Sequence, residues 1–485
     1  MDATPVATTS HGAVRGFRRG ETAVFLGIPF AQAPVGPLRF AAPKPVDPWD
    51  GVLDATEYGP TAQRGDTGIT LIPEPSVPGD ATLNVNVFAP SDATPDAVLP
   101  VLVWIHGGGF TTGSPASRWY DGDAFARDGV VTVVVSYRLG FDGFGTIDGA
   151  PSNRGLRDQI AALEWVRDEI RAFGGDPARV TIVGQSAGGG SVLALLASPA
   201  ASGLFHGAMA LSPALGAVTM PAARRFADRV AALAGVRADR EGFSSLPEEN
   251  LLELQRQAQK PEGRRRLAGI TALLDDGLPI GPVVDGDLLP QPPLEAIAAG
   301  ASSSIPLVIG STDDEFTMLT ARAKHLLSLI PVPLTLATLG LGRSRRRAYL
   351  ARSRRRGAAA RLGGYVSDRV IRSVVLRTAR ARPDAATWVY RFAWPSPSIG
   401  YACHCLDVPF WFDHLDADGV AAIAGDTPPV GVADAMHAAA VRFARTGDPG
   451  WAAWDAGTRR ARLFGAPAST PSVESDAYSD VAPLV

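Results

Sequence analysis

Apolar residues occur along this chain in short unbroken runs, separated by stretches in which they recur at helical spacing. The runs at 101–105, 130–135 and 180–183 are apolar on both faces, as in strands buried inside a sheet. Residues 154–173 instead carry apolar positions three and four residues apart, as one face of a helix does. This alternation predicts an α/β fold with a central, mostly parallel sheet flanked by helices.

The remaining pattern extends the same architecture over the whole chain. Further strand-like segments lie at 23–28, 83–88, 306–309 and 388–392. Residues 313–385 have an uneven helical pattern, and no internal repeat or low-complexity linker divides the sequence. We therefore expect a single domain over residues 1–485, with a helical insertion around 313–385.

Composition and charge narrow the possible partners. The 485 residues are 46% hydrophobic and 20% charged, and the formal net charge of −3 gives no general attraction for nucleic acid. The run at 130–135 is far too short to span a bilayer, and residues 1–15 have neither a basic start nor an apolar stretch. We therefore predict a cytoplasmic protein without membrane or nucleic-acid partners.

Two side-chain clusters have simple interpretations. Cys403, His404 and Cys405 stand together, but no further ligand group with zinc-like spacing accompanies them, so no metal or other cofactor is predicted. The two cysteines are also too close in sequence to favour a disulfide. Eight arginines fall between Arg343 and Arg356, and such a run is usually a solvated helix face or loop.

The main chemical signal is a serine between glycines. The sequence G-Q-S-A-G at 184–188 matches the G-x-S-x-G pattern, directly follows the predicted strand at 180–183 and opens a helical stretch at 191–196. In this strand–turn–helix context the serine hydroxyl is held out toward substrate. The amino end of the helix also directs its partial positive charge toward the serine. Ser186 is therefore the candidate nucleophile.

A glycine run upstream of the serine predicts an oxyanion hole. The sequence W-I-H-G-G-G-F at 104–110 places three glycines straight after a strand, as in the HGGG-type loops of esterases and lipases. Fixed backbone N–H groups suit the oxyanion that forms when serine attacks a carbonyl. We assign the donors to Gly108, Gly109 and Ala187.

A nucleophilic serine also needs a histidine base, which in this chain order follows the acid. His404 lies in a loop after the predicted strand at 388–392, where the base is expected, and His414 is the alternative. His325 and His437 lie in predicted helices and are interpreted as surface or packing residues.

The acid is less determined than the base. The predicted strand at 306–309 is followed by three carboxylates, Asp313, Asp314 and Glu315. Spacing alone does not choose among them.

Together these segments resemble the type-B carboxylesterases, the family that includes the cholinesterases. The matching segments run through nearly the whole chain in the family's order: F-L-G-I-P-F-A at 25–31, P-L-R-F at 37–40, N-R-G-L-R-D-Q at 153–159, F-G-G-D-P at 173–177 and F-A-R-T-G-D-P at 443–449. The resemblance implies an α/β-hydrolase fold. It also implies that Glu315 is the acid and His404 the base, which gives a Ser186–His404–Glu315 triad.

This chain departs from the family at several positions. Gln185 stands where relatives usually carry Glu, and Phe316 stands where they usually carry a small residue. The family's E-D-C-L segment is D-A-T-L at 80–83, so its common disulfide is absent. The resemblance further implies a structural ion pair between Arg39 and Asp80.

The sequence therefore predicts a serine hydrolase of small-molecule carboxylic esters that works through an acyl-enzyme and needs no cofactor. Phe110, Trp119 and Phe316 are candidates to line the substrate pocket, because they lie next to the motifs. A hydrolase of carbamates, thioesters or amides is the enzymatic alternative, since the same triad serves those reactions. The non-enzymatic alternative is a binding protein, because the family contains adhesion-type members that have lost the nucleophile.

Overall fold

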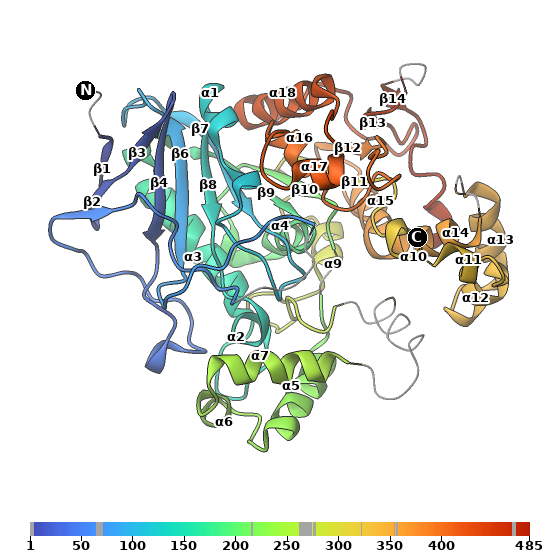
Figure 1. Cartoon of the computed structure of the whole chain (residues 1–485), viewed down its shortest axis with the longest axis horizontal. Coiled ribbons are helices and arrows are strands. Elements are labelled where there is room, and N and C mark those ends of the chain that lie inside the picture. Colours follow the sequence, from blue (N-terminus) through green and yellow to red (C-terminus); the bar gives the residue numbers. More distant parts are fainter. Residues whose placement is uncertain are drawn as a thin grey trace.

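The computed structural model describes residues 4–64, 71–214, 217–260, 274, 278–321, 323–353, 355, 357–467 and 472–485. Its main feature within these ranges is an 11-stranded sheet (Figure 1). In spatial order its strands are β14 (Val473–Glu474), β13 (Ala461–Phe464), β12 (Thr387–Phe392), β11 (Leu307–Thr312), β10 (Gly207–Leu211), β9 (Gly175–Gln185), β7 (Leu99–Ile105), β8 (Val131–Val135), β6 (Asn84–Pro90), β4 (Thr22–Pro29) and β3 (Phe17–Arg19). A small separate sheet contains β1 (Val6–Thr9), β2 (Gly12–Arg15) and β5 (Val52–Asp54).

The large sheet is parallel through its centre and antiparallel at its ends. Neighbouring strands from β13 across to β8 all run parallel. Strand β14 at one end, and β6, β4 and β3 at the other, pair antiparallel. The predicted mostly parallel sheet is confirmed, and each strand-like segment of the sequence lies in one of these strands or overlaps it.

Helices cover both faces of the sheet, because its central strands are apolar on both sides. In β7, Val101, Val103 and Ile105 pack in one core layer, whereas Leu102 and Trp104 pack in the other. The first layer is closed by α3 (Arg154–Glu169), α4 (Ala187–Ala197), α9 (Pro293–Ala298) and α15 (Ser373–Ala381). The second is closed by α1 (Asp123–Arg127), α16 (Val408–Trp411), α17 (Val420–Ala424) and α18 (Val430–Thr446).

Two further groups of helices lie outside these layers (Figure 1). The first, green in the figure, comprises α5 (Met220–Ala234), α6 (Arg240–Ser244) and α7 (Glu248–Gln259), which share a small apolar core with α2 (Gly140–Phe144). The second, beyond the β11–β12 side of the sheet, comprises α10 (Thr317–Ala321), α11 (Lys324–Leu327), α12 (Val332–Thr338), α13 (Arg343–Arg352) and α14 (Ala358–Ser367). The described part of 313–385 is thus helical, while the single-domain division stays a prediction. None of the helices in the described ranges is both long and apolar enough to cross a membrane.

Candidate active site

Ser186 occupies the tight turn between β9 and α4. Its φ of +59° lies in the left-handed region, which side chains rarely adopt. Its N–H donates to the Leu211 carbonyl at 2.9 Å, and its own carbonyl accepts from the N–H groups of Gly190 at 2.9 Å and Ala214 at 3.0 Å. These bonds hold a conformation that costs on the order of 1–3 kcal/mol. Ser186 stays partly exposed although its neighbours in the turn are buried.

The glycines around Ser186 meet a steric requirement. A Cβ at Gly184 would lie 2.4 Å from the backbone of Gly188, and a Cβ at Gly188 would lie 2.0 Å from the carbonyl oxygen of Ile105. Neither distance can be reached without moving backbone. The G-x-S-x-G pattern is therefore what allows helix α4 to start directly behind the serine.

His404 joins Ser186 to Glu315. Its Nε2 lies 2.9 Å from the Ser186 Oγ, and its Nδ1 is hydrogen-bonded to the Glu315 Oε2. Two backbone bonds hold the base and acid loops together: the His404 N–H donates to the Glu315 carbonyl at 2.9 Å, and the Asp314 N–H to the Ala402 carbonyl at 3.0 Å. The structure thus brings the three predicted residues into one continuous chain of hydrogen bonds.

The Glu315 carboxylate is fully buried and fixed by two further donors. Its Oε1 accepts from the Ser212 hydroxyl at 2.7 Å and from the Thr312 N–H at 2.9 Å. Ser212 was not found from the sequence, because the strand that precedes it, β10, was not recognised. The position of Ser212 could have indicated its role, because Ser212 directly follows β10 just as Ser186 directly follows the parallel neighbouring strand β9.

The surroundings of His404 favour its charged form. Burial alone would lower the pKa of His404, but the hydrogen-bonded Glu315 carboxylate outweighs it and raises this pKa above its ordinary value. Gln185 lies next to the imidazole ring, with its Nε2 3.3 Å from the His404 Nε2. The Cys405 thiol donates to the Gln185 Oε1 at 3.5 Å. A neutral amide therefore lies beside the predicted base.

A second buried carboxyl group follows His404 by three residues. Asp407 is completely buried, and its Oδ2 accepts from the Tyr390 hydroxyl at 2.9 Å. Its Oδ1 has no hydrogen-bond partner among the described residues. Burial, together with the nearby Glu315 charge, raises the pKa of Asp407 to about 6.

The predicted oxyanion loop lies directly against the nucleophile. A Cβ at Gly107 would lie 3.2 Å from the Ser186 Cβ, which measures how closely the loop approaches. Gly108 and Gly109 have φ angles of +101° and +61°, which favour glycine. Among the described residues, neither of their N–H groups has a backbone hydrogen-bond partner. Ala187, the third predicted donor, is the first residue of α4 and directly follows Ser186 in the chain.

The other downstream histidines lie away from Ser186. His414 Nδ1 is 3.3 Å from the Arg118 carbonyl oxygen, and His437 is buried between the Trp411 carbonyl and Asp128. His325 is exposed in α11. Only His404 contacts the serine among the four histidines considered.

The three candidate pocket aromatics have different positions. The ring of Phe316 lies 4.8 Å from that of His404, centroid to centroid, and is partly exposed. Phe110 is fully buried against Phe144, and Trp119 is fully buried with its Nε1 donating to the Asp418 carbonyl. Phe316 is thus the one of the three that presents surface beside the base.

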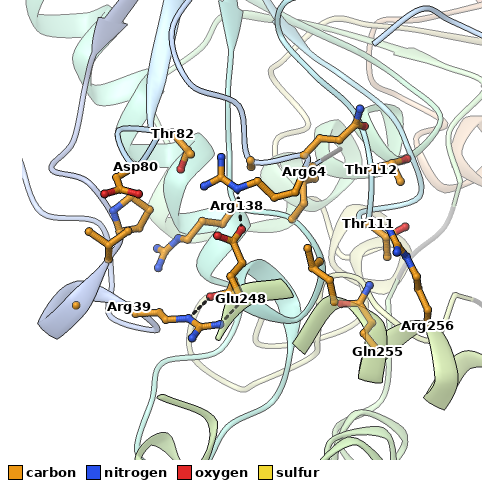
Figure 2. Close-up of a pocket in the computed structure, with 18 of the residues that line it drawn as sticks. Arg39, Arg64, Asp80, Thr82, Thr111, Thr112, Arg138, Glu248, Gln255 and Arg256 are labelled. Atoms are coloured by element: carbon orange, nitrogen blue, oxygen red, sulfur yellow. Dashed lines mark hydrogen bonds and ion pairs between the residues drawn. The ribbon is translucent and has the colours of Figure 1, made fainter. Parts of the chain in front are cut away.

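A cavity of about 600 Å³ adjoins the predicted oxyanion loop through Thr111 and Thr112 (Figure 2). Three of the four arginines that line it form close ion pairs: Arg39 with Asp142 at 2.8 Å, Arg64 with Glu248 at 3.0 Å and Arg138 with Asp158 at 2.7 Å. The expected Arg39–Asp80 ion pair is wrong, because Asp142 on α2 takes the Arg39 guanidinium while Asp80 stays exposed. Ser186, His404 and Glu315 do not line this cavity.

Within the described ranges, no group of three or more His, Cys, Asp or Glu side chains is arranged to hold a metal ion. Cys403 and Cys405 are both buried free thiols.

Comparison with known proteins gives consistent matches. The model of the carboxylesterase family matches residues 3–464. The para-nitrobenzyl esterase of Bacillus subtilis (strain 168) is 36% identical over 496 residues, covering 98% of this chain and 97% of that protein. Liver carboxylesterase 1 of Mus musculus is 37% identical over 341 residues, covering 64% of this chain, which spans 59% of that longer protein. The crystal structure of the Geobacillus stearothermophilus carboxylesterase EST55 at pH 6.2 has a TM-score of 0.84 and 35% identity, covering 99% of both chains.

Proposed function

The chain belongs to the carboxylesterase family and is a serine carboxylesterase of the α/β-hydrolase fold, and we propose that it hydrolyses small carboxylic esters through a Ser186–His404–Glu315 triad. The observation that supports this triad most directly is the hydrogen-bond chain from the Ser186 Oγ through both His404 nitrogens to Glu315. Serine alone is a weak nucleophile, and this arrangement supplies the base and the group that orients it.

In the first half of the reaction, the Ser186 oxygen attacks the ester carbonyl carbon while its proton passes to the His404 Nε2. Glu315 keeps the other nitrogen protonated and stabilises the imidazolium. The carbonyl oxygen becomes an oxyanion that accepts hydrogen bonds from the N–H groups of Gly108, Gly109 and Ala187. The carbon–oxygen bond to the alcohol then breaks, and the leaving oxygen takes the proton from His404, which leaves an acyl group on the serine.

In the second half, water replaces the alcohol. His404 removes a proton from the water as its oxygen attacks the acyl carbon, and the same N–H groups stabilise the second oxyanion. The bond to the Ser186 oxygen then breaks, the serine recovers its proton from His404, and the acid is released. The partly exposed ring of Phe316 lies beside His404, and we expect it to border the space that the alcohol or acyl group occupies.

Ser186→Ala is the direct test of this proposal. We expect the purified wild-type protein to hydrolyse p-nitrophenyl esters between acetate and decanoate, and the variant to lose this turnover. A p-nitrobenzyl ester belongs in the same series, because the Bacillus relative is named for that substrate. Ser202→Ala is the matched control, since Ser202 is an exposed serine just beyond α4.

Two results would require a different assignment. Retained ester hydrolysis by Ser186→Ala would show that Ser186 is not the nucleophile. If the wild type hydrolyses none of the esters but is labelled by a fluorophosphonate, the serine is activated and the substrates to test next are carbamates, thioesters and amides.

The cytoplasmic location expected from the sequence stays a prediction.

A further inference from the structure

The two carboxylates beside Glu315 are each held by a buried arginine. Arg391, on β12, donates to both oxygens of Asp313 at 2.8 and 2.7 Å. Arg355, in the segment between α13 and α14, donates through its Nε to the Asp314 Oδ1 at 3.0 Å. The turn that carries the proposed catalytic acid is therefore fixed by ion pairs on both residues that precede it.

Arg355 makes the more extensive set of contacts. Its Nη2 also donates to the Asp313 carbonyl at 2.5 Å, and its guanidinium reaches both oxygens of Asp368 at 2.9 and 3.3 Å. The Asp368 carboxylate is completely buried and accepts from the Tyr349 hydroxyl of α13 and from Arg372, each at 2.6 Å. One guanidinium thus connects the acid turn to the helices beyond it.

This role corrects the interpretation of the arginine-rich segment. Arg345 and Arg347 are exposed on α13, as a solvated face predicts, but the side chain of Arg355 is only 10% exposed. Arg354 and Arg356 lie outside the described residues. The segment therefore combines surface arginines with one that points inward.

Helix α14 leaves room for this side chain. A Cβ at Gly364 would lie 2.3 Å from the Arg355 Cδ and 2.4 Å from its Nε, so glycine is what allows the arginine to pass. The same helix fixes the other side of the turn, because the Ser367 Oγ accepts from the Phe316 N–H at 2.9 Å. Contacts on both sides of Glu315 thus come from one group of helices.

We propose that Arg355 is a positioning residue that fixes the Asp313–Glu315 turn and thereby holds the Glu315 carboxylate against His404. The inference rests on the proposed triad. Without Arg355, the partly exposed Asp314 and the buried Asp368 carboxylates lose a shared cation, and movement of the turn relieves that loss. Displacement by about 1 Å in such a site costs on the order of 100-fold in rate.

The test is steady-state hydrolysis of p-nitrophenyl acetate by the full chain across a pH series. We expect Arg355→Ala to lower kcat by about 10- to 100-fold with KM within about twofold, because the acid orients the base and does not bind the ester. The acid limb of its pH profile should move down, since a displaced Glu315 stabilises the His404 imidazolium less. Arg347→Ala, which removes an exposed arginine of the same segment, should match the wild type.

Conservative and paired variants keep the test decisive if Arg355→Ala folds poorly. Arg355→Lys keeps the positive charge but lacks the several N–H donors of the guanidinium, so its kcat should lie between those of Arg355→Ala and the wild type. Asp314→Asn removes the Arg355 contact from the other side, and we expect the double variant Arg355→Lys with Asp314→Asn to lose less kcat than the product of the two single losses. Wild-type kcat and an unmoved acid limb in Arg355→Ala, or independent losses in the double variant, would overturn the inference. Neither result affects the Ser186→Ala test, so the two proposals fail separately.

Discussion

Asp407→Asn should reduce the pH dependence of folding stability. The Asp407 carboxyl is completely buried beside Glu315, and its pKa rises from the ordinary value of 3.8 to about 6. The folded protein therefore holds this proton more tightly than the unfolded chain does. With respect to this group, stability is greatest below about pH 4 and is lost as the pH rises through the folded pKa near 6.

The size of this effect follows from the two pKa values. A rise from 3.8 to about 6 corresponds to about 3 kcal/mol, with a little under half of the loss falling between about pH 5 and 7. Asparagine has nearly the same shape and can still accept from the Tyr390 hydroxyl, but it is neutral at every pH. The free energy of unfolding of the variant should therefore rise relative to that of the wild type by about 3 kcal/mol across the whole range.

Urea unfolding followed by tryptophan fluorescence at several pH values between about 4.5 and 7.5 measures about 2 kcal/mol of this difference, because the rest falls below pH 4.5. Asp416→Asn, an exposed aspartate in the following segment, is the matched control and should track the wild type. A difference between Asp407→Asn and wild type that stays constant across the series would refute the reasoning, because the buried carboxyl would then titrate alike in both states.

Three further outcomes follow from the site. Ser212→Ala removes a hydrogen bond to the Glu315 carboxylate, and hydrogen bonds to charged groups contribute about 1.5–3 kcal/mol. We therefore expect kcat to fall about 10- to 100-fold with little change in KM, and an unchanged kcat in steady-state kinetics would contradict this. The acid limb of the wild-type kcat/KM profile should have its midpoint above pH 6.5, because the raised pKa of His404 means that a higher pH is needed to form the neutral imidazole that accepts the serine proton. A lower midpoint would contradict the environment described for His404. Gly188→Ala should abolish folded, active protein, because its Cβ would lie 2.0 Å from a β7 carbonyl oxygen. The control Gly431→Ala should fold normally, because its Cβ would meet no neighbouring atom within 4 Å. Thermal unfolding and ester hydrolysis measure both variants, and equal stability of the two would refute the steric argument.

Much of the sheet could be predicted because its strands carry their own signal. The runs in β7, β8 and β9 are rich in Val and Ile, and only burial on both faces explains such runs next to amphipathic helices. Strand β10, with the sequence G-A-M-A-L, lacks β-branched residues, and its two parallel neighbours supply its hydrogen bonds. Its absence from the prediction also hid Ser212.

The choice of acid shows a similar limit within the site. Asp313, Asp314 and Glu315 are adjacent carboxylates of similar chemistry, and the residues alone left all three open. In the structure Arg391 takes the first and Arg355 takes the second, which leaves Glu315 to reach His404. These partners come from distant parts of the chain, so no local pattern contains the answer. The predicted partner of Arg39 was wrong for the same reason, because the position of helix α2 decides which carboxylate Arg39 contacts.

The hydrogen bonds of the site join residues far apart in sequence: His404 lies 89 residues from Glu315 and 218 residues from Ser186. A contact between residues so far apart in sequence closes a long loop of chain, which costs conformational entropy, so we expect such contacts to form late in folding. Four neighbouring parallel strands, β9 to β12, must be in register before the serine meets its base. Recovery of esterase activity during refolding should therefore lag behind the return of helical and fluorescence signals, which makes catalysis a sensor for completion of the native topology.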